Sequence, residues 1–300
     1  MDYPLVSIII PNYNHARYLD ERIQSVLKQT YYNFEVIILD DKSTDNSLEV
    51  INKYKENPHI AKIIVSEQNS GSPFKQWEKG FKLAKGELIW IAESDDSCDI
   101  TFLEKLVYIH NKNNNVVTFC RSQRIDELDK KYNTFYNDLL SGTWNGKEFI
   151  QVYLGRYNII MNASSAIFNK EAALSANRQY LKYKGAGDWL FWIELVEKGS
   201  ISFTGETLNY FRKHSSNTTE KCYKNGTDFI EEKKIFDYLI TRNLITPNIA
   251  RKIRRKNIAK FSHYPFDSEK TRKKVMKTWD FSYFEYFRYY LSSIYYKIRY

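Results

Sequence analysis

The first 92 residues alternate between short apolar runs and amphipathic stretches, and this alternation constrains the fold more than any other feature of the chain. The apolar runs cover residues 6–10, 34–39, 60–65 and 88–92. Between them, apolar residues recur three and four positions apart in the stretches 18–29, 48–51 and 74–84. Apolar strands that alternate with helices are typical of a parallel sheet covered by helices on both faces. The sequence therefore predicts an α/β fold.

Polar segments directly follow three of the four predicted strands. They are PNYN at 11–14, DDKSTD at 40–45 and ESDD at 93–96. In open α/β sheets, ligands bind in the crevice outside the carboxyl ends of the strands. We therefore expect the three segments to face one crevice.

The segment ESDD brings three carboxylates, Glu93, Asp95 and Asp96, against the end of a buried strand. Two carboxylates about 4 Å apart repel by roughly 4 kcal/mol at an effective dielectric constant near 20, so such a cluster is expected to face a cation or hydrogen-bond donors. The sequence contains neither GxGxxG nor GxxxxGK[ST], the glycine-rich phosphate loops. A nucleotide diphosphate would then need another source of positive charge, and carboxylate-bound Mg²⁺ or Mn²⁺ supplies it.

The pattern changes twice further along the chain. Between residues 116 and 211 strand-like runs mix with a helical stretch at 189–196. After residue 213 only helical periodicity remains, at 229–239, 247–260 and 281–298. We therefore expect an α/β domain at 1–216, with a mixed and mostly parallel sheet flanked by helices, and a helical C-terminal region at 217–300.

The basic charge of the chain is concentrated at its C-terminal end. The net charge is +9, and residues 251–300 hold 14 lysines and arginines against 4 acidic residues. The first 250 residues are nearly neutral, with 31 basic and 32 acidic side chains. A localised basic patch on a neutral body favours contact with an anionic surface.

The last 22 residues add 11 aromatic side chains to this basic patch. The predicted helix places an apolar stripe on one side, made of Tyr283, Phe287, Tyr290, Leu291, Ile294 and Ile298. Aromatic and basic side chains together suit a membrane interface. The sequence therefore indicates contact with the inner face of the cytoplasmic membrane, and the alternatives are packing of the stripe on the catalytic domain or in a homodimer.

Three widely spaced cysteines, Cys98, Cys120 and Cys222, argue against a disulfide framework and a structural zinc site. The N-terminal residues lack the pattern of a signal peptide, and no apolar stretch reaches the ~18 residues of a membrane-spanning helix. These features predict a cytoplasmic location, with peripheral membrane attachment at most.

From about Leu5 to Thr218 the chain resembles the family 2 glycosyltransferases, which have the GT-A fold. Four segments carry the resemblance in the family's order. They are SIIIPNYNHARYLDERIQSVLKQTYYNFEVIILDDKSTDNS, GFKLAKGELIWIAESDD, GAGDWLFWIELVEKG and YFRKHSSNTT. The resemblance implies an inverting enzyme that moves a sugar from a nucleotide-diphosphate donor to an acceptor hydroxyl.

The resemblance also implies a nucleotide site near the N-terminus. Pro11, Tyr13 and Asn14 would line the base pocket, and Asp41 would accept a hydrogen bond from the base imide, which implies a uracil or thymine donor and favours a UDP-sugar. Lys75 is a further candidate, because its ammonium group can neutralise phosphate charge; the alternative is a solvated lysine on a helix.

The remaining implied roles concern the metal and the chemistry. ESDD resembles the family's DXD-type motif, so Asp95 would hold the ribose side and Asp96 would bind Mg²⁺ or Mn²⁺, with His214 approaching from the far side. Asp188 would be the catalytic base. Independently of the family, a carboxylate can take the proton of an attacking hydroxyl, and direct displacement inverts the anomeric carbon.

Each candidate also has a purely structural explanation. Asp41 can form a turn, and Asp95 and Asp96 can cap the helix that follows them. Asp188 can stabilise a helix N-terminus, and His214 can be a packed or surface histidine.

The implied acceptor is a glycan or lipid-linked molecule of bacterial surface polysaccharide synthesis. The missing QxxRW motif and membrane-spanning helices argue against a processive synthase. A sugar-nucleotide nucleotidyltransferase remains an alternative, although its glycine-rich, arginine-bearing loop is missing after the first strand. A non-enzymatic protein that binds through its basic tail is the other alternative, and no nucleic-acid partner is expected.

Overall fold

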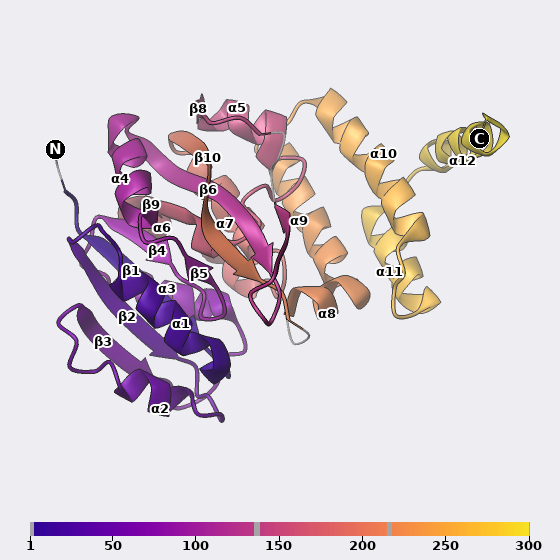
Figure 1. Cartoon of the computed structure of the whole chain (residues 1–300). Helices are drawn as coiled ribbons and strands as arrows, with labels where there is room; N and C mark the ends of the chain where they lie inside the picture. The colour runs from indigo at the N-terminus through magenta and orange to yellow at the C-terminus, as the bar shows by residue number, and fades with distance from the viewer. Residues whose placement is uncertain (1–2, 135–138, 215–217, 300) are drawn as a thin grey trace.

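The computed structural model describes residues 3–134, 139–214 and 218–299. Within these residues the chain forms a ten-stranded sheet with helices on both faces, followed by a group of C-terminal helices (Figure 1). The α/β fold predicted from the sequence is confirmed.

The strands are β1 (Val6–Asn12), β2 (Phe34–Asp40), β3 (Ile60–Val65), β4 (Leu88–Ile91), β5 (Ser97–Cys98), β6 (Asn115–Ile125), β7 (Lys131–Thr134), β8 (Gly142–Asn145), β9 (Ala166–Asn169) and β10 (Ser200–Arg212). The two longest of these strands are β6, with 11 residues, and β10, with 13 residues.

The α-helices fall into a group that covers the sheet and a C-terminal group. The first is α1 (Ala16–Leu27), α2 (Ser47–Asn52), α3 (Pro73–Leu83), α4 (Phe102–Lys112), α5 (Gly146–Phe149), α6 (Lys170–Leu174) and α7 (Gly187–Val196). The second is α8 (Thr218–Lys224), α9 (Thr227–Thr241), α10 (Pro247–His263), α11 (Glu269–Trp279) and α12 (Tyr283–Arg299).

The sheet has the order β3-β2-β1-β4-β9-β6-β10-β5, with β7 beside β6 and β8 beside β10. β3, β2, β1, β4, β6 and β10 run in the same direction, whereas β9 runs antiparallel between β4 and β6. The carboxyl ends of β1, β2, β4, β6 and β10 consequently meet along one edge, where the polar segments lie.

Alternate residues of β1 enter the two cores of the sheet, as the pleat requires. Ile9 belongs to the core under α3 and α7, whereas Ile8 and Ile10 belong to the core under α1 and α4. Helix α3 approaches β1 closely at Gly80, because a Cβ there would lie 2.6 Å from Ile9 Cγ2. A larger side chain at this position would push α3 away from the sheet.

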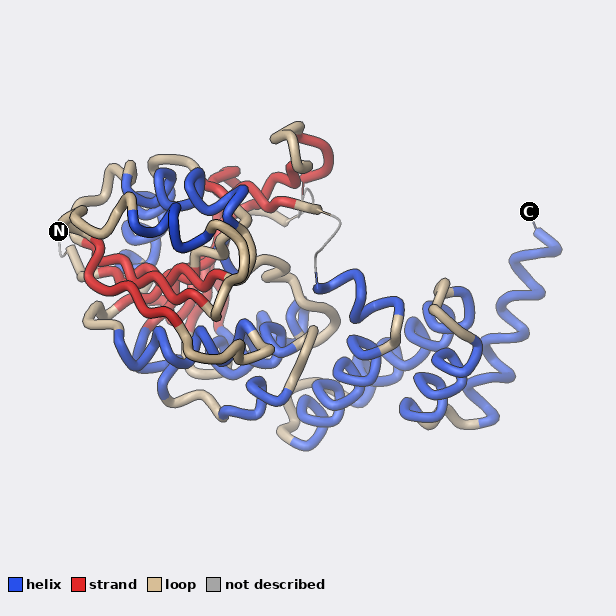
Figure 2. The backbone as a smooth tube through the Cα atoms, turned by 90° about the horizontal axis from the view of Figure 1, so that it is seen from below, coloured by secondary structure: helices blue, strands red, loops and turns tan. Residues whose placement is uncertain are grey.

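The C-terminal helices continue one of these cores rather than forming a separate one. Phe229, Phe236, Phe261 and Trp279 are buried in the same cluster as residues of α7 and the sheet. Helix α12 lies at the far end of this group, away from the sheet (Figure 2). The predicted boundary at residue 216 lies outside the described residues.

Two differences from the sequence-based prediction have clear physical reasons. Among the strand-like runs expected between residues 116 and 211, the two at 201–205 and 207–211 form the single strand β10, because register shifts between Thr204 and Asn209 absorb the break in the pattern. Helix α11 was not predicted, because it is strongly basic and buries only Val275 and Trp279. Among the described residues, no helix is long and apolar enough to cross a bilayer.

We predict that Trp279→Ala destabilises the α/β part of the chain together with the C-terminal helices. The Trp279 ring is buried, and its Nε1 donates a hydrogen bond to the Phe229 carbonyl at 2.8 Å. Loss of a buried tryptophan costs about 3–5 kcal/mol. Differential scanning calorimetry should show one transition with a lower midpoint, at roughly 2–4 °C per kcal/mol.

The control for this variant is Tyr283→Ala, because the Tyr283 side chain is 95% exposed. It should change the free energy of unfolding by no more than about 0.5 kcal/mol. Two separate transitions in Trp279→Ala, with only the smaller one shifted, would show that the helical region folds independently.

Candidate functional site

Hydrogen bonds tie the loops after β1 and β2 together. Asn12 Nδ2 donates to Asp40 Oδ2 at 2.8 Å, and the Asn14 side-chain carbonyl accepts the backbone N–H of Thr44 at 2.7 Å. Asn14 has a φ of 56°, a left-handed conformation that asparagine adopts more readily than most residues. The first two polar segments therefore form one connected rim.

Asp41 lies on this rim, and neighbouring donors hold both of its carboxylate oxygens. The Ser70 backbone N–H lies 3.0 Å from each oxygen, the Ser70 hydroxyl donates at 2.7 Å, and Gln76 Nε2 donates at 2.5 Å. Lys75 Nζ donates to the Ser70 carbonyl at 2.9 Å. Pro11 is buried in β1, whereas Tyr13 is 45% exposed beside the rim.

The carboxyl groups of the ESDD segment occupy three different environments. Asp96 is buried, and its Oδ2 accepts hydrogen bonds from Asn162 Nδ2 at 2.8 Å and the Ser164 hydroxyl at 2.6 Å. Its Oδ1 accepts the backbone N–H of Arg212 at 3.0 Å. Glu93 accepts a hydrogen bond from Trp77 Nε1 at 2.9 Å. Asp96 therefore connects the ESDD segment to residues 162–164 and to the end of β10, and Glu93 connects it to α3.

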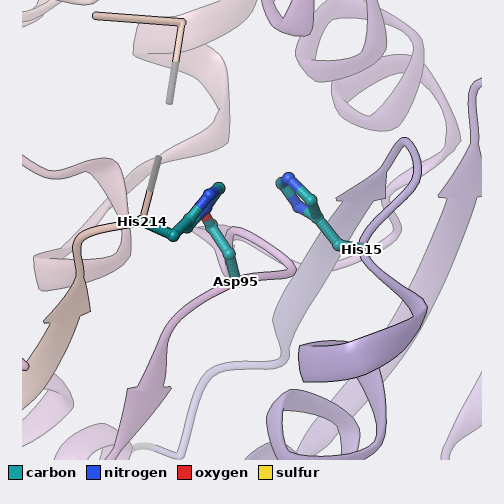
Figure 3. A group of neighbouring side chains, drawn as sticks. All are labelled: His15, Asp95 and His214. Atoms are coloured by element: carbon teal, nitrogen blue, oxygen red, sulfur yellow. The ribbon is translucent and has the colours of Figure 1, made fainter. Parts of the chain in front are cut away.

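Asp95 instead faces two histidines from distant segments (Figure 3). His214 Nε2 lies 2.9 Å from Asp95 Oδ2, and one ligand atom from each of His15, Asp95 and His214 lies within 4.8 Å of the others. The Ser94 hydroxyl lies 2.8 Å from His15 Nδ1 and orients that ring. Among the described residues, these three form the group with the composition of a metal site.

Burial and charge separate the pKa values of these acids. Burial, followed by the charges of Asp95 and Asp96, raises the pKa of Glu93 to about 8. Burial and the Asp95 charge raise the pKa of Asp96 to about 6. Burial also acts to raise the pKa of Asp95, but the His214 hydrogen bond and the two histidine charges hold it below its ordinary value. Asp95 is thus the acid of this segment that stays ionised most readily.

The buried guanidinium of Arg212 holds the segment in place. Its Nε donates to the Asp95 carbonyl at 2.9 Å, one terminal nitrogen pairs with Glu21 at 2.6 Å, and the other pairs with Asp129. Because Arg212 ends β10 two residues before His214, these bonds fix Asp95 relative to the histidine.

Asp188 lies in the first turn of α7, at a different part of the same edge. Its Oδ2 accepts a hydrogen bond from Asn158 Nδ2 at 2.8 Å, and its Oδ1 accepts the backbone N–H of Trp189 at 2.8 Å. Burial raises the pKa of Asp188 to about 7, although these two bonds oppose the rise. Its carboxyl group therefore changes protonation near neutral pH.

A cavity of about 400 Å³ opens beside Asp188. Residues from the ends of β6 and β10, including Arg124 and Phe211, form one wall, and α9 and α10 form the opposite wall. The segment 155–162 connects this cavity to the ESDD segment, because Asn158 contacts Asp188 and Asn162 contacts Asp96. A ligand in the cavity would lie beside the carboxyl group of Asp188.

The structure groups the predicted site residues differently from the sequence analysis. It brings Asp95 and His214 together, adds His15, and places Asp96 outside the group with its oxygens engaged by structural donors. The sequence analysis missed His15, although a histidine directly after a polar segment at a strand end was the available signal. Asp41, Tyr13 and the other predicted base-pocket residues lie on the neighbouring rim.

The sequence profile described as "Glycosyl transferase family 2" matches residues 7–176. The chain is similar to glycosyltransferase GlyG of Streptococcus pneumoniae, with 27% identity over 81% of this chain and 68% of that protein. It is 30% identical to the glycosyltransferase alr2836 of Nostoc, over 71% of this chain and 66% of that protein. It is 26% identical to the poly(ribitol-phosphate) beta-N-acetylglucosaminyltransferase TarS of Staphylococcus aureus, over 76% of this chain and 39% of TarS.

Solved structures of S. aureus TarS share the fold. The structure of its residues 1–349 with UDP superposes with a TM-score of 0.59 at 22% identity, covering 77% of this chain and 64% of that one. The complex with UDP-GlcNAc also gives a TM-score of 0.59, at 23% identity, over 77% and 65% of the two chains. The present chain thus spans about two thirds of the length of GlyG and alr2836, and 39% of the length of TarS.

Proposed function

The chain belongs to glycosyl transferase family 2 and is a glycosyltransferase with a GT-A fold, and we propose that it is a metal-dependent, inverting enzyme that uses a UDP-sugar. The observation that carries this proposal is the group of His15, Asp95 and His214 at the carboxyl edge of the sheet. We propose further that the acceptor is a glycan or lipid-linked molecule of bacterial surface polysaccharide synthesis.

The donor atoms of His15, Asp95 and His214 fit a divalent cation. Two imidazoles and one carboxylate suit Mn²⁺ better than Mg²⁺, which prefers oxygen ligands. A bound cation would neutralise the charge that develops on the departing diphosphate. In our proposal Asp96 does not bind the metal but positions Asp95, because its hydrogen bonds from Asn162 and Ser164 fix the segment that carries both residues.

A cavity of about 580 Å³ adjoins His214, and its wall contains two basic residues, Arg17 and Lys213, and two acidic residues, Asp126 and Glu127. Arg17 pairs with Glu127 at 3.2 Å, and in our proposal Lys213 faces the diphosphate. UDP and UDP-GlcNAc are present in the TarS complexes, which supports a uridine donor for this chain. We propose that the nucleoside binds on the neighbouring rim, against Pro11, Tyr13, Asn14, Asp41 and Lys75. Asp41 would then give up its hydrogen bond from Ser70 or Gln76 and accept one from the base imide instead.

Asp188 has the properties that the reaction requires of a base. Its carboxylate faces a cavity large enough for a sugar ring, and Asn158 and the Trp189 backbone N–H fix its orientation. A proton acceptor with a pKa near neutrality is well matched to removing a hydroxyl proton as the bond to the sugar forms. Direct attack with a single base inverts the anomeric carbon.

Helix α12 carries the features of a membrane contact. Tyr283, Phe284, Phe287 and Tyr290 are exposed, and the surrounding region is strongly basic. Aromatic rings insert at the headgroup level of a bilayer, and each nearby basic residue adds about 1 kcal/mol on an anionic surface. We propose that α12 holds the enzyme on the cytoplasmic face of the membrane, near a lipid-linked acceptor.

We predict that UDP with Mn²⁺ stabilises the protein and that Asp95→Asn abolishes this effect. A ligand at 100 times its Kd adds about 2.7 kcal/mol to the free energy of unfolding. Thermal unfolding with UDP, TDP, GDP and CDP, each with and without Mn²⁺, should show the largest shift for UDP with Mn²⁺. His214→Ala should behave like Asp95→Asn.

The informative comparison is Asp96→Asn. An amide at position 96 would place its N–H group against one of the donors Asn162, Ser164 and Arg212. The free energy of unfolding should therefore fall by roughly 1–3 kcal/mol. The thermal shift with UDP and Mn²⁺ should be retained. A lost nucleotide shift in Asp96→Asn and a retained one in Asp95→Asn would contradict the assigned metal ligands. No shift with any nucleotide in the wild type would contradict the proposed function.

We predict that turnover falls tenfold per pH unit below about pH 7, because Asp188 must be ionised to accept the proton. Asp188→Asn should lower kcat by about 10²–10⁴-fold. The measurement is kcat between pH 5 and 9 with saturating Mn²⁺ and donor, together with nucleotide binding at each pH to exclude loss of the metal. A full rate at pH 5 would exclude Asp188 as the base.

We predict that the protein floats with phosphatidylglycerol-containing vesicles and not with phosphatidylcholine vesicles, and that salt weakens the binding. The triple variant Tyr283→Ser, Phe284→Ser and Phe287→Ser should remain unbound. Tyr32→Ser is the matched control, because Tyr32 is an exposed aromatic residue on the catalytic part. If the triple variant floats like the wild type but has a smaller sedimentation coefficient than the wild type, the exposed aromatic residues of α12 would instead form a homodimer interface.

A further inference from the structure

The cavity beside Asp188 has a second buried acid in its wall. Asp228 lies in the first turn of α9 and is only 4% exposed. Together with Asp188, it lines the cavity between α7 and the C-terminal helices. The cavity is therefore built from both the α/β part of the chain and the helices that follow it.

Within the described part of the chain, Asp228 differs from its neighbours on α9 in having no hydrogen-bond donor. Glu231 accepts the backbone N–H groups of Lys184, Gly185 and Ala186 at 2.8–3.0 Å, and Glu232 pairs with Lys260 at 3.1 Å. No described residue donates a hydrogen bond to Asp228, and its Oδ1 is fully buried. A buried acceptor without a donor costs about 1–3 kcal/mol. Because Oδ1 lies against the Gly185 backbone, a ligand in the cavity would have to reach the carboxyl group through its other oxygen, Oδ2.

The backbone opposite Asp228 leaves room for this carboxyl group. A Cβ on Gly185 would lie 1.7 Å from Asp228 Oδ1, so a side chain at position 185 and the present position of Asp228 exclude one another. The Glu231 carboxylate fixes this backbone, because it accepts the N–H groups of Lys184, Gly185 and Ala186. The loop before Asp188 is thus held in a form that accommodates a second acid.

The charges around Asp228 keep its carboxyl group hard to ionise. Burial, then the charges of Asp188, Glu232 and Glu231, raises the pKa of Asp228 to about 8, and Lys260 on α10 acts in the opposite direction. A ligand hydroxyl that donates to Oδ2 would relieve this environment, because it supplies a hydrogen bond without adding negative charge.

Aromatic side chains complete the cavity. Tyr157, Trp189, Tyr223 and Trp279 are in its wall, from both parts of the chain. A pocket with aromatic faces and a few convergent polar groups fits a ligand with apolar faces and directional hydroxyls. Sugar rings have this combination, since their C–H groups lie on the ring faces and their hydroxyls at the edge.

We propose that Asp228 is a recognition residue for the acceptor sugar and accepts a hydrogen bond from a hydroxyl next to the one that attacks. The proposal rests on the glycosyltransfer function proposed above. Asp188 faces the attacking hydroxyl, and Asp228 binds the sugar through a group that does not react. The C-terminal helices thereby take part in the choice of acceptor.

The test uses the full-length protein and a panel of p-nitrophenyl glycosides of glucose, galactose, N-acetylglucosamine and N-acetylgalactosamine. Saturation-transfer NMR measures binding of each glycoside to the wild type, Asp228→Asn and Asp228→Ala. Transfer from a mixture of UDP-sugars, and hydrolysis of those donors without glycoside, are followed by mass spectrometry. Asp237→Asn is the matched control, because Asp237 is an exposed acid on the same helix, outside the cavity wall.

We expect Asp228→Ala to weaken glycoside binding by roughly tenfold to a hundredfold, and Asp228→Asn by less, because its amide oxygen still accepts a hydrogen bond. The UDP–Mn²⁺ shift should not change, because Asp228 is not among the residues proposed to hold the nucleotide or the metal. The melting temperature of Asp228→Asn should equal or exceed that of the wild type, since the variant removes an unpartnered buried acid. A purely structural residue would lower it.

Two results would overturn the assignment. One is unchanged glycoside binding in Asp228→Ala. The other is a wild type that hydrolyses UDP-sugars but binds no glycoside of the panel. Failure of the glycosyltransfer function would appear separately, as a missing UDP–Mn²⁺ shift in the wild type.

Discussion

The burial of the Arg212 guanidinium is the constraint on which the candidate site depends. A guanidinium taken out of water is costly unless its N–H groups find acceptors, and this one draws acceptors from three directions. Glu21 comes from α1, Asp129 from the turn before β7, and the Asp95 carbonyl from the loop after β4. Three segments that are distant in sequence are thereby fixed around the end of β10, and His214 lies two residues further along the chain.

The fold was predictable because its signals are local and repeated. Each of the first four strands is an apolar run, and the helices between them have regular apolar spacing, so a short window of sequence contains the information. The extent of β10 was not predictable in this way, because its register shifts depend on β6. The shared core of the C-terminal helices likewise depends on distant partners such as Phe229 and Trp279.

The candidate site shows the same limit at the scale of single residues. The sequence located the segment ESDD but did not determine which acid faces the histidines, because neighbouring side chains in a turn can exchange roles. The choice is made by Asn162 and Ser164, which lie far along the chain and bind Asp96. His15 escaped notice for a related reason, since its relation to Asp95 exists only after β1 and β4 pair.

The position of β9 has a consequence for biosynthesis. β4 pairs with β1 on one side and with β9 on the other, and β9 begins only at Ala166. While residues 92–165 emerge from the ribosome, the outer backbone groups of β4 have no strand beside them. An open apolar strand edge readily pairs with other chains. During this interval the nascent chain is therefore exposed to aggregation through the free edge of β4, until the antiparallel strand β9 covers it.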